Sequence, residues 1–544
     1  MDLYKGQNKP SFANAVSLYQ SGKSAQAQDI LKSIIKQNPV NHQALDFLGT
    51  VSLENKNYKA AIKFTKRAIN IVKTSPRYIL NYAIALCYSG QIKKSIFILA
   101  NFSEKNPGNG NLIISLGDVF LGSQQYEKAT SVFVEATKFM PENPELYMKL
   151  GMAHQVSGNF NNAQNAYKKA ILMGGISADV HCNLGSIYLL QDELELGISE
   201  FKKAISLDPN HHRSHQSIGQ EFSRRGKYHD AIPYLRRAVS TNPKDIASIC
   251  ELANALANTG QPAASVEVCE EALKKFPNQI NILVQSAFSF FIAQKYQKVI
   301  SSCKKALTIS PGNISALAFL SSALNEIGNR DEASLYLNFE ELIETNMISP
   351  SPAFPSLCEF NTALEDTVYR HPTLEVKESN RSLSQGLCTS NLFDGNETPA
   401  LIHLREKIFT SFQNYLKKRP IDVNHPYLFR HPTKINLYCW ANIIEEGGFH
   451  DVHFHPTAWL SGVYYPKLPE EIKSSHIECI DGCLEFGRSY YRLKSSDDPP
   501  VHLIKPKEGL IVLTPSYFGH RTIPFKSLQK RMSIAFDIIP ESFT

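Results

Sequence analysis

The sequence lacks the paired cysteines of a secreted or zinc-stapled protein. Its ten cysteines are scattered along 544 residues, and only Cys479 and Cys483 lie close to each other. Structural zinc ribbons and disulfide-rich scaffolds both need cysteines in close pairs, so the sequence argues against both classes. Scattered thiols predict a protein of the reducing cytoplasm.

A long apolar run and an excess of one charge are also missing. The most apolar stretch spans residues 282–293 and includes glutamine and serine, so it is too short and too polar to cross a bilayer. The first residues have neither the basic start nor the apolar core of a signal peptide. With 57 basic and 51 acidic side chains the net charge is +6, so we expect neither a nucleic-acid nor a membrane partner.

The first part of the chain repeats itself with a period of about 34 residues. Prolines recur at this spacing or at twice this spacing, at positions 39, 107, 141, 209, 243, 277 and 311. A small residue lies ten positions after each mark of this period: Gly49, Ala83, Gly117, Gly151, Gly185, Gly219, Ala253, Ala287 and Ser321. The period and the pattern are similar to those of the tetratricopeptide repeat (TPR).

Each repeat of this kind is a helix, a turn and a second helix. Small residues are needed where the two helices cross, and proline ends the second helix because it cannot continue one. The sequence predicts about ten such units over residues 6–345, forming an α-helical solenoid. Solenoids of this type offer a concave groove, so we expect a protein or peptide partner there.

After residue 345 the repeat pattern stops. Residues 346–360 contain three prolines and three serines and are predicted to form a linker. In the remaining part, residues 361–544, one helix is expected at 401–418. Short β-like runs follow at 435–444, 458–468, 482–488, 509–518 and 531–539. Such a succession of strands favours a barrel or a sandwich.

Histidines gather in one stretch of this second part. Side chains alternate between the two faces of a strand, so His453 and His455 project to the same side and Asp451 joins them. His450 is expected to point the other way. Two imidazoles two residues apart supply half of a metal site, and the best candidate for a further ligand is His520, at the end of another strand-like run.

Four motifs in this order resemble a known family. They are His453-Phe454-His455, SGVYY at 461–465, PSYFGH at 515–520 and Arg531-Met532-Ser533. Together they resemble the 2-oxoglutarate- and Fe(II)-dependent oxygenases, and more closely the oxygenase family often fused to TPR repeats. The resemblance covers about residues 356–544. It implies a double-stranded β-helix, or jelly roll, with Fe(II) as cofactor and 2-oxoglutarate as cosubstrate.

The resemblance also implies the metal ligands. His453 matches the first histidine of the family and His520 the distal one. The wider superfamily has a carboxylate two residues after the first histidine, whereas this chain has His455 there. The remaining ligand is therefore either His455, which we favour, or the carboxylate of Asp451.

The cosubstrate site follows from the same resemblance. Arg531 matches the basic residue that pairs with the distal carboxylate of 2-oxoglutarate, and Ser533 would donate a hydrogen bond to that carboxylate. Tyr438 and Tyr464 are further candidate donors. No catalytic residue is expected beyond the metal centre, since the sequence has neither a Gly-rich phosphate loop nor a second nucleophile.

These features predict a dioxygenase that uses O₂ to hydroxylate a protein or peptide captured by the repeats. Two alternatives stay open. One is a TPR interaction scaffold whose jelly-roll domain is catalytically inactive, which the unusual His-x-His keeps in play. The other is an oxygenase of a small molecule or glycan, in which the repeats serve only assembly.

Overall fold

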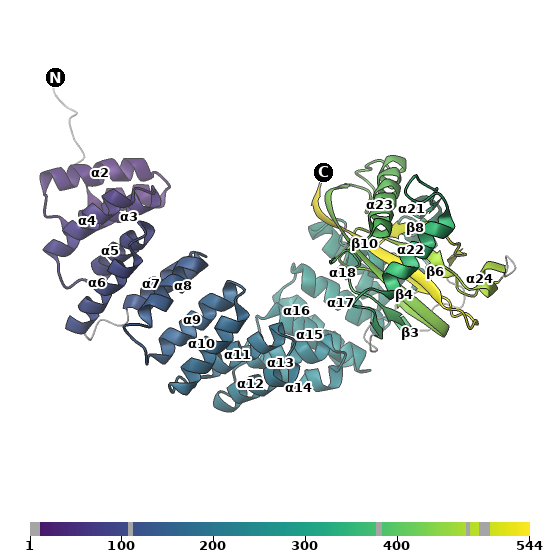
Figure 1. Ribbon diagram of the computed structural model, residues 1–544, viewed down its shortest axis with the longest axis horizontal. Coiled ribbons are helices and arrows are strands. Elements are labelled where there is room, and N and C mark those ends of the chain that lie inside the picture. The colour runs from purple at the N-terminus through teal and green to yellow at the C-terminus, as the bar shows by residue number, and fades with distance from the viewer. Residues whose placement is uncertain (1–10, 107–111, 377–382, 396, 475–478, 489–500) are drawn as a thin grey trace, which may run out of the picture. The chain divides into compact units, whose positions relative to one another are not determined.

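The computed structural model describes residues 11–106, 112–376, 383–395, 397–474, 479–488 and 501–544. Residues 6–10, the predicted start of the repeats, and Pro107 lie outside these ranges. The chain divides into two compact units, residues 1–218 and 219–544. Helical repeats occupy the first unit and begin the second, which ends in a β-sheet (Figure 1).

Helices α1 to α20 follow one another as ten pairs. Their bounds are α1 Phe12–Gln20, α2 Ser24–Gln37, α3 His42–Glu54, α4 Tyr58–Ile71, α5 Pro76–Tyr88, α6 Ile92–Lys105, α7 Leu112–Gly122, α8 Tyr126–Ala136, α9 Pro144–Val156, α10 Phe160–Leu172, α11 Ala178–Leu190, α12 Leu194–Leu207, α13 His212–Arg224, α14 Tyr228–Thr241, α15 Ile246–Asn258, α16 Pro262–Lys275, α17 Ile280–Ile292, α18 Tyr296–Ile309, α19 Ile314–Glu326 and α20 Arg330–Ser334. The predicted solenoid is confirmed. In the described part of the chain, no helix combines the length and the apolar character that a membrane span requires.

Glycines lie where the two helices of a pair touch, as the period predicts. A β-carbon added at four of them would come within 2.2–2.9 Å of a side chain in the second helix of the same pair. The pairs are Gly117–Phe133, Gly151–Tyr167, Gly185–Phe201 and Gly219–Leu235. Contacts that short do not occur between real side chains, so only glycine allows the helices to approach this closely.

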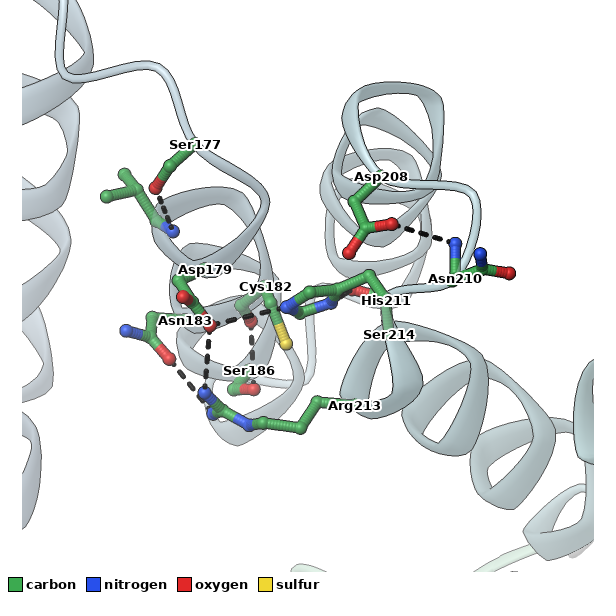
Figure 2. Close-up of polar contacts among 11 residues, drawn as sticks. Ser177, Asp179, Cys182, Asn183, Ser186, Asp208, Asn210, His211, Arg213 and Ser214 are labelled. Atoms are coloured by element: carbon green, nitrogen blue, oxygen red, sulfur yellow. Dashed lines mark hydrogen bonds and ion pairs between the residues drawn. The ribbon is translucent and has the colours of Figure 1, made fainter. Parts of the chain in front are cut away.

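Polar side chains also join neighbouring repeats. At α11, Ser177 caps the helix by accepting a hydrogen bond from the Val180 backbone (Figure 2). From the next repeat, Arg213 of α13 donates to Asn183 Oδ1 at 2.9 Å, and His211 Nε2 lies 3.3 Å from Asp179 Oδ1. Hydrogen bonds require a particular geometry, so these contacts help to fix the orientation of one repeat on the next.

The C-terminal region is built on one antiparallel sheet. Its elements are α21 Phe339–Leu342, β1 Glu344–Met347, α22 Leu357–Tyr369, β2 Glu375–Val376, β3 Leu383–Cys388, α23 Pro399–Lys418, β4 Pro432–His453, β5 Leu460–Lys467, α24 Glu470–Ser474, β6 Leu484–Phe486, β7 His502–Ile504, β8 Leu510–Pro515, β9 His520–Thr522 and β10 Arg531–Phe543. The strand order is β1-β8-β5-β10-β4-β9-β6-β7, with β3 also paired to β4 and β2 to β3.

The sheet curls around its longest strands, β4 and β10, and the predicted jelly-roll class is confirmed. Helices α22 and α23 lie beside it (Figure 1) and contact β5 and β8. One face of β10 enters the core that these helices share, through Met532, Ile534, Phe536 and Ile538. The alternate residues face the interior of the curl, because strand side chains alternate.

The segment between repeats and sheet is not a plain connection. Residues 346 and 347 belong to β1, which pairs with β8, and α22 begins at Leu357 with a capping box formed by Ser356 and Glu359. Serine favours this N-cap position because its hydroxyl accepts from a free backbone N–H. The domain boundaries at 345 and 361 stay predictions.

Candidate metal centre

A cavity of about 530 Å³ opens inside the curled sheet. On β10 its wall is formed by every second residue: Arg531, Ser533, Ala535, Asp537 and Ile539. Strand β4, the neighbour of β10, contributes Tyr438, Trp440 and Asn442. The remaining wall combines valine, leucine and phenylalanine side chains with the hydroxyl side chains of Ser461, Thr514 and Thr522.

Three histidines meet in this cavity. His453 ends β4 and pairs in register with His520 of β9, while His455 follows two residues after His453. The ring centroids of His453 and His520 are 4.4 Å apart, and that of His455 is 5.2 Å from each. One ring nitrogen from each histidine lies within 4.8 Å of the other two. Three nitrogens this close can bind a single metal ion.

The opposite nitrogen of each ring is already bonded to the protein. Nδ1 of His453 lies 2.8 Å from the Asp451 carbonyl oxygen, and Nδ1 of His520 lies 3.0 Å from that of Phe518. Nδ1 of His455 lies 2.6 Å from Asp537 Oδ1. Carbonyl and carboxylate oxygens only accept, so each Nδ1 donates, and in the neutral ring Nε2 is then the nitrogen with the lone pair. Metal-binding histidines show this pattern, in which an acceptor fixes the tautomer.

Burial keeps two of these imidazoles, those of His453 and His520, neutral. Burial lowers the pKa of His453 and His520 well below the usual value, and the neighbouring imidazoles lower it further. A fourth imidazole nearby, that of His450, has its pKa lowered to about 3 by burial and by the charge of Arg531. At neutral pH, Nε2 lone pairs are therefore available to a metal without competition from protons.

The other end of the cavity holds a buried positive charge. Arg531 is 1% exposed, and its guanidinium lies 5.1 Å from the centre of the Tyr465 ring. Its Nη1 donates to Ser533 Oγ at 3.3 Å. Among the described residues, Nε has no hydrogen-bond partner and no carboxylate forms an ion pair with the guanidinium. Since a guanidinium stays charged, the cavity is suited to an anionic ligand.

Comparison with known families agrees with this geometry. Residues 438–537 match the family described as "Putative 2OG-Fe(II) oxygenase". Residues 12–76, 178–211 and 224–286 match tetratricopeptide repeat families, and residues 51–170 match the N-terminal TPR region of Psidin. The chain joins tetratricopeptide repeats to a domain that matches the family described as putative 2OG-Fe(II) oxygenases. No curated protein is significantly similar to it.

Solved structures resemble this TPR–oxygenase chain only weakly. One chain of the APC/C hetero-tetramer Cut9–Hcn1 aligns with 56% of this chain and with 59% of its own length, at 16% sequence identity and a TM-score of 0.34. PilF of Pseudomonas aeruginosa aligns with 36% of this chain and with 90% of its own length, at 22% sequence identity and a TM-score of 0.32. The C-terminal part of a TPR protein from Cytophaga hutchinsonii aligns with 42% of this chain and with 92% of its own length, at 15% sequence identity and a TM-score of 0.37. Scores this low carry no argument about function.

Two residues of the oxygenase domain lie differently from the simple alternation of a strand. The Asp451 side chain is exposed, and among the described residues the group of potential ligand atoms contains only the three histidines. His450, expected on the opposite face, lines the cavity instead. The reason is a register shift between His450 and His453 in the pairing of β4 with β9, which interrupts the alternation.

The two tyrosines proposed for the cosubstrate site also separate. Tyr438 lines the cavity and is 38% exposed. Tyr464 does not line it, because it pairs with Ile534, whose side chain is in the core, and its hydroxyl donates to Asn361 Oδ1. Its neighbour Tyr465 lines the cavity beside Arg531. Directly paired residues share a face, so this outcome follows from the register of β5 against β10.

Asp537 is a residue of the site that the motifs do not reveal. Its Oδ1 accepts hydrogen bonds from His455 and from Ser461 Oγ, both at 2.6 Å, and it is 8% exposed. A signal was present in the sequence: Asp537 lies six positions after Arg531, so an uninterrupted strand places both on one face. Among the described residues, the site therefore has a carboxylate behind one of the histidines and none in the group of potential ligand atoms.

Proposed function

We propose that the domain is an Fe(II)- and 2-oxoglutarate-dependent dioxygenase that hydroxylates a protein or peptide bound by the repeats. One observation carries the proposal. A single cavity has three convergent imidazole nitrogens in one place and, in another, a buried guanidinium that no described carboxylate pairs with. These are the two groups that such an enzyme needs, one for the metal and one for the distal carboxylate of the cosubstrate.

The donor set fits Fe(II). Neutral imidazoles are good ligands for Fe(II), and each of the three is oriented by an acceptor behind it. His453, His455 and His520 would hold the ion. When bound, Fe(II) and 2-oxoglutarate together supply the chemistry that inserts one atom of O₂ into a C–H bond while 2-oxoglutarate becomes succinate and CO₂.

Three neutral ligands leave the charge of the ion uncompensated in its immediate shell. The Asp537 carboxylate, 2.6 Å from His455 Nδ1, supplies a negative charge directly behind this ligand. Through that hydrogen bond it raises the electron density of the His455 ring, so part of its charge reaches Nε2. This arrangement supports metal binding in the absence of a directly coordinated carboxylate.

The rest of the cavity orients the cosubstrate. Arg531 would pair with the distal carboxylate, and Ser533, already 3.3 Å from the guanidinium, would help to fix its position. Tyr465 adds a wall next to this pair. Trp440 stacks on His455 with ring centroids 5.7 Å apart, which restricts the imidazole and keeps water from that side.

The repeats supply the reason for a macromolecular substrate. TPR repeats commonly mediate protein–protein interactions, and here ten helix pairs of this kind precede the oxygenase domain in one chain. We therefore propose that they hold a protein or peptide whose side chain enters the cavity. A cytoplasmic location, drawn from the scattered cysteines, stays a prediction.

The test is turnover by the full-length protein. Protein purified without oxygen and loaded with Fe(II) should bind one equivalent of iron and convert 2-oxoglutarate to succinate when O₂ is admitted. His453→Ala should lose both properties, whereas His229→Ala, at an exposed histidine of α14, should keep them. Iron binding without succinate would favour the inactive scaffold, and turnover by His453→Ala would refute the metal centre.

A further inference from the structure

Aromatic side chains from the last repeats stand behind the histidine cluster. Phe454, between His453 and His455, makes an edge-to-face contact with Phe319 of α19, with ring centroids 5.7 Å apart and planes at 86°. Phe319 is 5% exposed and lies in the apolar core of the last repeats. Phe454 also packs against the core of the sheet, so one ring joins the two cores.

A second aromatic contact lies behind His520, the third histidine of the cluster. Phe339 of α21 makes an edge-to-face contact with Phe518, with ring centroids 5.3 Å apart. Phe518 provides the carbonyl oxygen that accepts from His520 Nδ1. Next to it, the Tyr517 hydroxyl donates to the Tyr336 carbonyl oxygen at 2.6 Å, which ties the same turn to the end of the repeats.

We propose that the last repeat and the segment that follows it position the metal-binding histidines, through Phe319 on Phe454 and through Phe339 on Phe518. The inference rests on the proposed metal centre and adds a part to it that lies outside the oxygenase domain. In this arrangement Phe454 and Phe518 are positioning residues, since neither offers a metal ligand.

The physical basis is close packing. A strand turns successive side chains to opposite faces, so the Phe454 ring points away from the cavity while its two neighbours point into it. Interiors are packed too densely for a ring to shift alone, so loss of a neighbour moves the backbone that carries it. A displacement at Phe454 would rotate His453 and His455 together and separate the three Nε2 atoms.

The experiment uses Co(II) as probe and the full-length protein. Co(II) titration by calorimetry gives the affinity, and the d–d absorption of the bound ion reports its coordination geometry. Phe454→Ala and the milder Phe319→Leu should each weaken Co(II) binding, by about tenfold for Phe454→Ala, and alter the absorption. Phe454→Leu should restore part of both, because it refills most of the volume.

The matched control is Phe290→Leu, the same change in the same repeat core. Phe290 of α17 is 2% exposed, and Lys298 Nζ lies 5.7 Å from the centre of its ring. It should lower the melting temperature about as much as Phe319→Leu but leave the Co(II) absorption unchanged.

Three results would overturn the proposal in distinguishable ways. If wild-type protein binds no Co(II), the metal centre itself is wrong. If wild type binds and the Phe454 and Phe319 variants bind equally well with the same absorption, the positioning role is wrong and the metal centre stands. If Phe290→Leu changes the absorption as Phe319→Leu does, a general loss of packing in the repeats is the cause and the positioning role is wrong.

Discussion

Replacement of Arg531 by methionine should raise the free energy of unfolding of the ligand-free protein. The same replacement should greatly weaken the binding of 2-oxoglutarate. The guanidinium is 1% exposed and no described carboxylate pairs with it, so in the ligand-free protein it is a buried charge with no opposite charge beside it. Methionine has a similar length and no charge. Relief of such a charge should raise the free energy of unfolding by on the order of 1–4 kcal/mol.

The effect of 2-oxoglutarate has the opposite sign. Removal of one partner from a buried ion pair costs about 3–5 kcal/mol, which corresponds to roughly 100- to 5,000-fold in affinity. Wild-type protein with bound Co(II) should gain about 2.7 kcal/mol of stability at a 2-oxoglutarate concentration 100 times the dissociation constant. Arg531→Met should gain about 0.4 kcal/mol or less at that concentration, and its Co(II) affinity should stay near that of wild type.

Urea unfolding with and without 2-oxoglutarate measures both effects. Arg521→Met is the control, because Arg521 pairs with the buried Glu485 at 2.8 Å and its loss should destabilise the protein. The reasoning would be refuted by an Arg531→Met protein that is less stable than wild type and still stabilised by 2-oxoglutarate. That result would mean that Arg531 has a structural role.

Three further predictions concern other parts of the molecule. Asp537→Asn should weaken Co(II) binding about 10- to 100-fold, measured by calorimetry, because the amide keeps the shape but not the charge behind His455. His450 has a pKa of about 3 when folded and about 6.5 when unfolded, so below pH 6.5 the unfolded chain takes up the proton. Metal-free protein should therefore lose about 1.4 kcal/mol of stability per pH unit at this residue as pH falls from 6.5 toward 4, and His450→Gln should remove that loss in urea titrations at pH 6.5 and 5.0. Gly117→Ala should lower the free energy of unfolding by about 1–3 kcal/mol, because its β-carbon would meet the Phe133 ring at 2.2 Å. Gly122→Ala lies in the same helix, where an added β-carbon would have no atom within 4 Å, and should be neutral or slightly stabilising. Thermal melts of both variants measure the difference.

The repeats and the histidine cluster were within reach of the sequence because each rests on a local rule. The repeat period fixes which small residues face the partner helix, as Gly117 against Phe133 shows. Strand alternation places His453 and His455 on one face, and the β9 strand brings His520 opposite His453. The repeat period and strand alternation need no knowledge of distant contacts, whereas His520 lies far from His453 in the sequence and is assigned from the motif that contains it.

The errors have a different origin. Whether Tyr464 or Tyr465 faces the cavity depends on the register of β5 against β10, and the side chosen by His450 depends on an irregularity in β4. A shift of one residue exchanges the two faces of a strand, and no local sequence feature announces it. The pairing of β1 with β8 joins segments that lie far apart in the sequence and is equally invisible there.

Strand β1 also bears on how this protein avoids aggregation. All six residues of β8 are buried, and β1 occupies the side of β8 that β5 leaves open. Without β1, that side would present an apolar strand with free backbone groups, which is a template for pairing with other chains. The short strand ends the sheet with Glu344, which is paired with Lys418 and with Arg419 at 3.0 Å. A fragment that begins after residue 347 should therefore associate through its exposed β8, and residues at the junction with the repeats protect the sheet from such association.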